Sequence, residues 1–196
     1  FTYKHESKLG KTRRKLPNGN RVAIITNAGG PGILATDMTI SSDLTLASFQ
    51  KETIEELANS LPATANLHNP VDVIGDAPSD RYESALQAVI KDEGVDGALV
   101  ILTPQSMTNA LGTAEAVVRV ARRSPKPILC SFMGIVDVSA GVKYLQNNGY
   151  PVYKFPENAA KSFASLYKFS KWVNRDRLTE FKFKQDKEQA AALIAG

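Results

Sequence analysis

The stretch Arg21–Gly32, RVAIITNAGGPG, decides the fold of this chain. Its first half, Arg21–Thr26, is a short apolar run that is typical of a parallel strand buried on both faces. Its second half is rich in glycine, and Pro31 suits the first turn of a helix. Glycines at such a turn allow positive φ and close approach to a ligand, and a helix N terminus attracts anions. The pattern predicts a phosphate site formed by Asn27, Ala28, Gly29, Gly30 and Gly32.

The same alternation of strand and helix continues along the chain. We expect further strands at 44–47, 97–102, 127–132 and 151–153, and further helices at 51–61, 81–91, 110–123, 138–148 and 156–172. Strands that alternate with helices of this length form right-handed crossovers and a parallel sheet covered on both faces. The predicted class is α/β, a three-layer doubly wound parallel sheet, flavodoxin-like, with about five strands in the order 2-1-3-4-5.

The chain divides into one domain and two flanks. Residues 1–20 are polar and basic and are predicted to form an N-terminal linker or arm, and 21–173 form the domain. Residues 174–196 are predicted to be a second linker, with a strand-like 181–183 and a short alanine-rich helix at 187–195. The chain begins without Met, which suggests a fragment of a longer protein.

Charge is distributed unevenly along the chain. Residues 1–21 contain seven basic and one acidic group, and residues 161–196 contain eight basic and four acidic groups. Residues 22–160 contain nine basic and fifteen acidic groups. Because a nucleic-acid reader concentrates basic charge on its folded face, this distribution argues against nucleic-acid binding.

Composition and motifs exclude several classes of function. No apolar run is long enough for a membrane span, and the single Cys130 suits a buried thiol in a reducing cytoplasm. No Walker pattern, dinucleotide fingerprint, Gly-x-Ser-x-Gly elbow or metal-ligand spacing occurs. His5 lies in the arm and His68 in a loop, where a structural role is the simpler interpretation. We therefore assign no catalytic residue and no metal site to this chain.

Other polar residues follow the predicted strands at the same sheet edge, where ligands of parallel sheets bind. Thr103 and Gln105 follow the strand at 97–102, and Gly134 follows the strand at 127–132. Asn69 and Asp72 lie in a long segment rich in Asn, Asp and Pro. We predict that these loops contact a substrate or a partner, although such residues also form self-bonded turns and helix caps.

Three separated motifs carry a family resemblance. The stretch Arg21–Gly32, then Asn69-Pro70-Val71-Asp72, then Asp96-Gly97 through Leu102-Thr103-Pro104-Gln105 resemble the ADP-forming (NDP-forming) acyl-CoA synthetases, of which the acetate-CoA ligases are the nearest comparison. The resemblance runs from about residue 17 to 173. It implies the succinyl-CoA-synthetase-like flavodoxin domain, one of two such domains that pair in the full enzyme.

The resemblance also implies a reaction and a set of partners. The family converts acyl-CoA, ADP and phosphate to acid, CoA and ATP through a phosphohistidine, which helix N termini stabilise. The family's histidine lies in a Ser-His-Thr-Gly type motif of the sister domain, and that motif is absent from this sequence. The CoA-binding Rossmann domain and the ATP-grasp domain, which bind CoA, ADP or ATP, and Mg, are absent as well. The resemblance therefore implies a fragment of a cytoplasmic ligase that is inactive alone. It implies that the fragment binds phosphate and has no covalent cofactor. The face that normally meets the sister domain would be exposed, so the fragment can form a homodimer through it.

Two alternatives keep the same fold. The domain could be a synthetase-like regulatory module of a protein lysine acetyltransferase, or a stand-alone flavodoxin-like phosphate-binding domain. An electron-transfer flavodoxin is disfavoured because the first turn has glycines in place of hydroxyl residues, and a receiver domain because the first strand ends in Thr26-Asn27. The acyl substrate, the choice of ADP or GDP and the oligomeric state are not encoded in these motifs.

Overall fold

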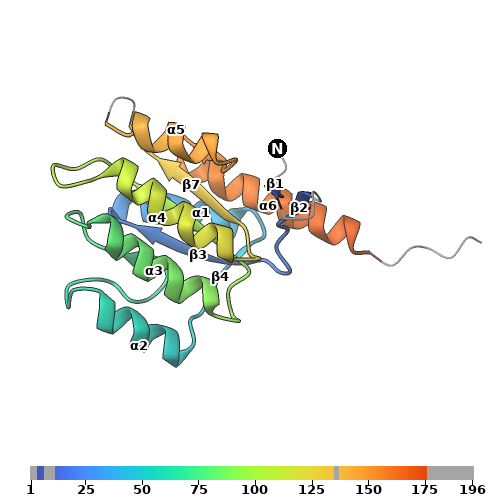
Figure 1. The fold of residues 1–196 in the computed structure, drawn as a ribbon. Coiled ribbons are helices and arrows are strands. Elements are labelled where there is room, and N and C mark those ends of the chain that lie inside the picture. The colour runs from blue at the N-terminus through green and yellow to red at the C-terminus, as the bar shows by residue number, and fades with distance from the viewer. Residues whose placement is uncertain (1–3, 7–11, 135–136, 176–196) are drawn as a thin grey trace, which may run out of the picture.

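The computed structural model describes residues 4–6, 12–134 and 137–175 (Figure 1). In chain order the elements are β1 (Lys4–Glu6), β2 (Thr12–Arg14), β3 (Arg21–Thr26), α1 (Gly29–Ser41), β4 (Thr45–Leu46), α2 (Lys51–Ser60), β5 (Val71–Asp72), α3 (Ser79–Lys91), β6 (Gly97–Leu102), α4 (Ala110–Arg123), β7 (Ile128–Phe132), α5 (Ser139–Asn147), β8 (Val152–Tyr153) and α6 (Pro156–Val173).

Strands β3 to β8 form one parallel sheet. Its path is β4-β3-β6-β7-β8, and β5 also pairs with β3. In sequence terms this path is the flavodoxin-like order 2-1-3-4-5, as predicted. Strand β4 pairs with Arg21 and Val22 at the start of β3, whereas β5 pairs with Ile25 and Thr26 at its end. Two short strands therefore share the edge of β3 that lies away from β6.

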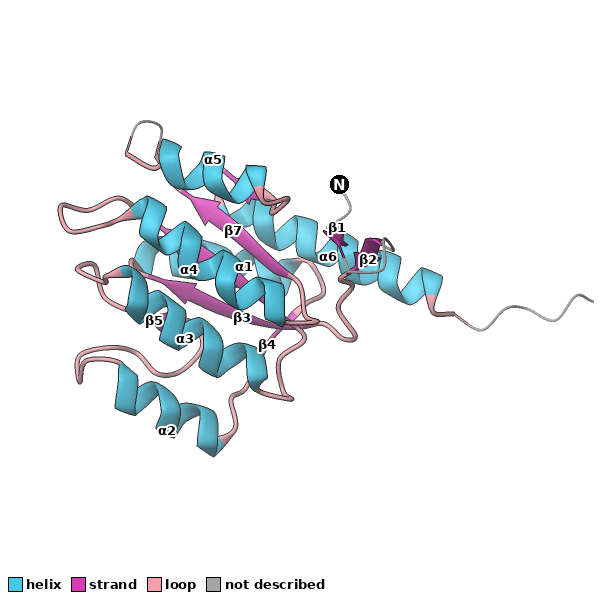
Figure 2. Cartoon of the chain, viewed as in Figure 1, coloured by secondary structure: helices cyan, strands magenta, loops and turns pink. Residues whose placement is uncertain are grey.

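Helices cover both faces of the sheet, as Figures 1 and 2 show. Helices α1 and α6 pack on one face, where Ile24 and Leu99 meet Phe163 of α6 in a buried cluster. Helices α2 to α5 pack on the other face, where Ile25 and Val100 belong to a larger cluster. Successive strand residues point to opposite faces, so strands buried on both sides must be apolar at every position. That requirement explains the continuous apolar runs in β3, β6 and β7.

Most predicted elements are present with small shifts at their ends. The helix predicted at 110–123 has those bounds, whereas α3 begins at Ser79 rather than at Arg81. Strand β5 was missed, because its two residues lie in the segment that the sequence marked as a loop. The predicted arm contains the antiparallel pair β1 and β2. The strand-like 181–183 and the helix predicted at 187–195 lie outside the described residues.

The topology gathers the predicted site residues at one edge. The loops after β3, β5, β6 and β7 all leave from the carboxyl ends of parallel strands. Helices α1 and α6 start at this carboxyl edge and run back along the sheet (Figure 1). The carboxyl edge therefore combines helix N termini with the polar loops, while the segment before β3 and the end of α6 lie at the opposite, amino edge.

Candidate functional site

Asn27 ties the end of β3 to the end of β6. Its Oδ1 accepts hydrogen bonds from the backbone N–H and the hydroxyl of Thr103, at 2.9 and 3.0 Å. Its Nδ2 donates to the Thr103 carbonyl at 2.9 Å. Gln105 Nε2 donates to the Asn27 carbonyl at 3.4 Å. The buried Asn27 side chain thus has a structural task, and it fixes the backbone from which the glycine turn starts.

The backbone N–H groups of the glycine turn differ in their hydrogen-bond acceptors within the protein. Ala28 N–H donates to Thr26 Oγ1 at 3.1 Å, and Gly32 N–H donates to the Ala28 carbonyl at 3.2 Å. Gly29 and Gly30 are exposed, and across the described part of the chain no acceptor is hydrogen-bonded to either N–H. These two amides at the start of α1 are thus available to a ligand, and phosphate binding by the glycine turn stays a prediction.

Helix α1 lacks the usual side-chain groups at its N terminus. Its N-cap residue is Ala28, which makes no side-chain cap, and its first turn contains no acidic residue. Helix α4 is different, because Asn109 Oδ1 accepts a hydrogen bond from Gly112 N–H at 2.8 Å. Ser, Thr, Asp or Asn normally satisfies the first N–H groups of a helix, and an anion can take their place.

The three glycines of the turn have different surroundings. A Cβ built on Gly29 or Gly30 would have nothing within 4 Å, whereas a Cβ on Gly32 would lie 3.0 Å from Thr26 Cγ2. The expectation of positive φ in this turn is wrong: among the described glycines, only Gly134 and Gly149 have positive φ, at 123° and 79°. Packing therefore accounts for Gly32 but not for Gly29 and Gly30, where a side chain would extend into open space.

Asn69 has a structural position within the sheet. Its Oδ1 accepts a hydrogen bond from Ile24 N–H at 2.9 Å, and its Nδ2 donates to the carbonyls of Val22 and Ala47 at 2.8 and 3.0 Å. Both ends of the side-chain amide are therefore used by backbone groups of β3 and the segment after β4. Contact with a substrate stays a prediction for this residue.

The other predicted loop residues come together at the carboxyl edge. Asp72 Oδ1 accepts a hydrogen bond from Ile74 N–H at 2.9 Å and closes a local turn. Gln105 lies against Gly75, where any Cβ would collide with the Gln105 side chain. Gly134 lies beside Pro104. The loops after β5, β6 and β7 are thus neighbours of one another, as expected for a parallel sheet.

Exposed apolar side chains also lie in the segments that leave the carboxyl edge, and the sequence did not predict them. Ile33 and Leu34 of α1 are 62% and 46% exposed, and Met107, in the loop after β6, is 71% exposed. Leu111 in the first turn of α4 and Phe155 before α6 are exposed too. We call these five residues the apolar rim. The adjacent pair Ile33-Leu34 could have predicted an exposed apolar side chain, because two residues at successive helix positions cannot both face the sheet.

The remaining reactive side chains are not part of the glycine turn. His68 is exposed in the loop before β5, and its backbone N–H donates to Asn66 Oδ1 at 3.2 Å. Cys130 is fully buried, as predicted, and burial raises the pKa of its thiol to about 12. Among the described residues, no group of three or more His, Cys, Asp or Glu side chains is arranged to hold a metal ion. No helix within the same ranges has the length and apolarity for crossing a membrane.

Comparison with sequence families and curated proteins gives concordant matches. The family model described as Ligase-CoA domain matches residues 22–178. An acetate–CoA ligase (ADP-forming) I of Archaeoglobus fulgidus is 37% identical over 166 residues, which are 85% of this chain and 23% of the relative. An acetate–CoA ligase (ADP-forming) of Methanocaldococcus jannaschii is 45% identical over 157 residues, 78% of this chain and 22% of the relative. This chain thus spans about a quarter of the length of these curated relatives.

Solved structures match over the same region. A protein from Pyrococcus horikoshii OT3 superposes with a TM-score of 0.78 and 35% identity, covering 82% of this chain and 38% of that one. The dinucleotide forming acetyl-coenzyme A synthetase 1 of Candidatus Korarchaeum cryptofilum, in complex with phosphate and ADP, gives a TM-score of 0.74 at 27% identity. That match covers 83% of this chain and 37% of the synthetase chain.

Proposed function

This chain belongs to the Ligase-CoA domain family, and from that premise we propose that it is the domain of an ADP-forming acetyl-CoA synthetase that stabilises a phosphohistidine at the N terminus of α1. The reaction of the parent enzyme is acyl-CoA + ADP + phosphate ⇌ acid + CoA + ATP. A histidine on a mobile loop of a sister flavodoxin-like domain carries the phosphoryl group. CoA, the nucleotide and Mg bind to a Rossmann domain and an ATP-grasp domain of the same parent.

One observation carries this proposal: the N–H groups of Gly29 and Gly30 have no acceptor in the described protein, and both residues are exposed. A phosphoryl group on a histidine carries negative charge and several acceptor oxygens. Two N–H groups without a protein acceptor and the positive end of the α1 dipole fit such a group without any cationic side chain. Because the amides are fixed by the helix, they stabilise the charge without rearrangement during transfer.

The apolar rim supports a partner at the same edge. Ile33, Met107 and Phe155 are exposed in three different segments that leave the carboxyl edge. Contiguous exposed apolar groups mark surfaces that other proteins or domains cover. A sister domain seated on this rim would exclude water from the phosphoryl group, and hydrogen bonds to a charged group are stronger in a water-poor site.

Phosphate titration of the chain tests the anion site directly. With ¹⁵N-labelled protein at constant ionic strength, inorganic phosphate at millimolar concentration should shift the amide signals of Gly29 and Gly30 in a saturable way. Absence of any shift at these two residues up to about 20 mM phosphate, where contacts worth about 2 kcal/mol would register, contradicts the proposal.

Kinetics of the full-length parent test the catalytic role. Gly30→Leu places a bulky side chain beside the free amides, so we expect phosphoryl transfer to slow by about 10²-fold, with little change in CoA binding. Ser41→Leu, at the exposed opposite end of α1, is the matched control and should leave both quantities unchanged. Equal losses of phosphoryl transfer and CoA binding in Gly30→Leu count against the assignment.

The acetyltransferase-module alternative shares the fold but not the chemistry. The relatives compared above are named as CoA ligases, which favours the synthetase. The parent gene separates the two hypotheses. An encoded ATP-grasp domain supports the synthetase, and an encoded acetyltransferase domain supports a regulatory module.

A further inference from the structure

Helix α1 has apolar side chains on both of its faces. Its inner face packs on the sheet and on α6, which lies beside it (Figure 2), and Ala35 is fully buried there. On the outer face, Ile33, Leu34 and Ile40 are 62%, 46% and 59% exposed. A helix at the surface of a protein usually has polar residues on its outer face, whereas a helix that is apolar all round is usually buried. The composition of α1 therefore indicates a second neighbour that covers its outer face.

Helix α2, on the opposite face of the sheet, has the usual pattern. Its exposed positions include Glu52, Glu55 and Glu56, and its apolar Leu57 is fully buried. In the other described helices, exposed large apolar residues lie only in a first or last turn, at Leu111, Trp172 and Val173. In α1 such residues extend from the second turn to the last. The outer face of α1 is therefore unusual within the described part of this chain.

Three exposed residues of α1 lie on one line along the helix. Ile33, Asp37 and Ile40 are four and three positions apart, and Leu34 lies beside the first two. Residues three and four apart are neighbours on a helix surface, and alternation of these spacings is typical of two helices that pack along each other. At a rise of about 1.5 Å per residue, the line from Ile33 to Ile40 is about 10 Å long. We call these four residues the α1 seam.

Asp37 is the charged residue of the α1 seam. Within the residues that the structure describes, its carboxylate takes part in no hydrogen bond or ion pair. The neighbouring Ser41 Oγ donates to the Asp37 backbone carbonyl, at 2.7 Å, and not to the carboxylate. A neighbour that covers the seam removes this carboxylate from water, which is costly unless a cation lies opposite. The seam therefore fits a neighbour that supplies a basic side chain.

Charge complementarity argues against a second copy of this chain as the neighbour. The α1 seam contains an acidic residue and no basic one. In a pairing of two α1 helices, Asp37 would lie against an apolar residue or against its own equivalent. Either arrangement leaves a covered carboxylate without a cation. A different helix, with apolar residues and one basic residue, satisfies both the apolar and the charged parts of the seam.

We propose that the α1 seam docks a helix from another domain of the parent enzyme, with apolar side chains against Ile33 and Ile40 and a lysine or arginine opposite Asp37. The proposal rests on the proposed function only in that the chain is one domain of a larger synthetase. The curated relatives are about four times as long as the part that this chain matches, so their remaining length can supply such a helix.

The α1 seam is distinct from the glycine turn. Ile40 lies at the end of α1 away from Gly29 and Gly30, so a domain that covers only the turn would leave Ile40 exposed. The seam also contains none of the N–H groups that the proposed phosphoryl site uses. Docking along the seam would fix α1 from its outer face, while those amides stay available at its start.

Reactivity of introduced thiols measures whether the seam is covered. Ile33→Cys and Ile40→Cys are made separately in the full-length parent and in the 196-residue chain, and labelling by N-ethylmaleimide is followed by peptide mass spectrometry. Cys130 is fully buried, so it contributes little labelling. Both introduced thiols should react at least about tenfold more slowly in the parent than in the chain. Ser60→Cys, at the exposed end of α2, is the control and should react at equal rates in both.

Charge reversal tests the basic group opposite Asp37. In the parent that carries Ile40→Cys, Asp37→Lys should speed labelling at position 40 by at least about threefold, because two like charges then face each other at a covered surface. Glu55→Lys reverses the same charge on the exposed face of α2 and should leave labelling slow. Equal rates in these two variants contradict the basic group assigned to the partner helix.

The labelling rates also identify the other possible occupants. Equal labelling of position 40 in parent and chain overturns the proposal, because the seam is then uncovered. Protection at position 33 alone overturns it too, and leaves a partner on the glycine turn. Slow labelling of the 196-residue chain by itself assigns the seam to a second copy if it depends on concentration, and to a segment of the same chain if it does not. The phosphate titration of Gly29 and Gly30 is independent of these results, so the two proposals fail separately.

Discussion

The side chain of Asn69 takes the place of a strand beside Ile24. Its Oδ1 accepts the hydrogen bond of Ile24 N–H at 2.9 Å, in the gap between the short partners β4 and β5. Its Nδ2 bonds the carbonyl of Val22 on the same edge of β3. Because Ile24 and Val22 are fully buried, these backbone groups have no access to water.

Replacement of Asn69 should therefore destabilise the domain. Asn69→Ala leaves the buried Ile24 N–H without a partner and removes the bond to the Ala47 carbonyl, while the Val22 carbonyl keeps the Ala47 N–H. We expect the free energy of unfolding to fall by about 2–4 kcal/mol. Urea denaturation followed by circular dichroism measures this change. Asn66→Ala in the same loop, whose side-chain bonds are solvent-exposed, is the control and should lower stability by less than about 1 kcal/mol. Equal effects of the two substitutions would show that Asn69 does not complete the sheet.

The glycines of the turn should respond differently to the same substitution. Gly30→Ala adds a methyl group in open space on a helix, so we expect it to raise stability by about 0.4–1 kcal/mol. Gly32→Ala forces a Cβ to 3.0 Å from Thr26 Cγ2, and we expect a loss of about 1 kcal/mol or more. Thermal denaturation of both variants provides the comparison. A large loss in Gly30→Ala would mean that the fold itself, rather than a ligand, requires glycine there.

The sequence was informative where neighbouring residues decide the structure. Strands β3, β6 and β7 are buried on both faces and therefore consist of uninterrupted apolar residues. Helix α4 was placed residue for residue because its apolar positions recur at helical spacing and two arginines end it. The strand order 2-1-3-4-5 was predicted from the flavodoxin-like class that the alternation of strands and helices indicated, and the structure has this order.

The sequence was uninformative where distant residues meet. Asn69 bonds Ile24 across 45 positions, and the Asp92 carboxylate bonds Thr53 and the backbone N–H of Gln50, at the start of α2. No local pattern distinguishes such an Asn or Asp from one in an exposed turn. For the same reason, the sequence predicted one anion site for the whole glycine turn. It could not distinguish Gly29 and Gly30, whose N–H groups have no acceptor among the described residues, from Gly32, which packs against Thr26.

Asp96 should make the domain sensitive to acid. Burial alone would raise the pKa of Asp96, but hydrogen bonds and charge from Arg21 outweigh it, so the pKa lies below its ordinary 3.8. A carboxyl with a lowered pKa stabilises the fold above pH 3.8, and this stabilisation is lost as pH falls through the folded-state value. Asp96→Asn should lower stability by about 1 kcal/mol at pH 7, a magnitude reduced by the exposure of Arg21.

The pH dependence of that difference provides the check. Urea denaturation of wild type and Asp96→Asn should give stabilities that converge as pH falls below 3.8. Asp76→Asn, which removes the exposed partner of Arg81, should change stability little at any pH. A gap for Asp96→Asn that is constant with pH contradicts the role assigned to its charge.

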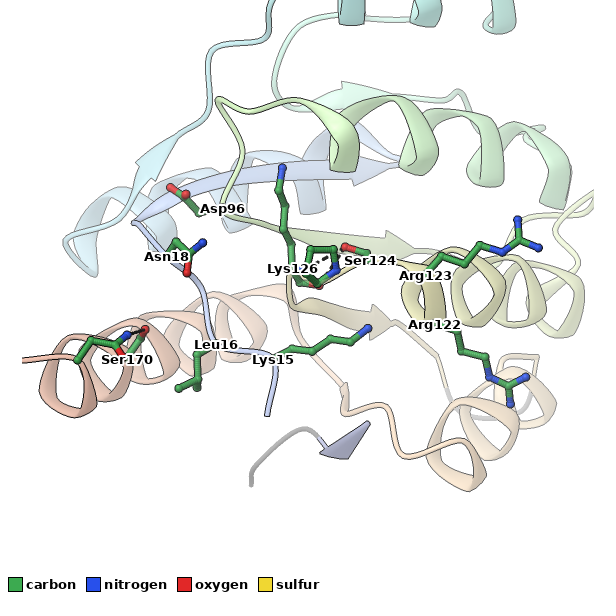
Figure 3. Close-up of a pocket in the computed structure, with 11 residues that line it drawn as sticks. Lys15, Leu16, Asn18, Asp96, Arg122, Arg123, Ser124, Lys126 and Ser170 are labelled. Carbon is green, nitrogen blue, oxygen red and sulfur yellow. Dashed lines mark hydrogen bonds between the residues drawn. The ribbon is translucent and has the colours of Figure 1, made fainter. Parts of the chain in front are cut away.

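Lys15 should make the stability of the domain rise with pH at alkaline pH. It is 6% exposed, and burial lowers its pKa from 10.5 to about 8. Lys15 lines a cavity at the amino edge of the sheet, together with Arg122, Arg123, Lys126 and Asp96 (Figure 3). Asp96 forms an ion pair with Arg21. Between pH 8 and pH 10.5 the unfolded chain binds a proton that the folded chain has released, so wild-type stability should rise with pH across this window. Lys15→Met removes this titration, and the wild type should gain at most about 2 kcal/mol relative to the variant between pH 7 and pH 9.5. Lys51→Met, on the exposed surface of α2, is the matched control. Parallel stability curves for wild type and Lys15→Met would show that burial does not lower the pKa of Lys15 in the folded chain.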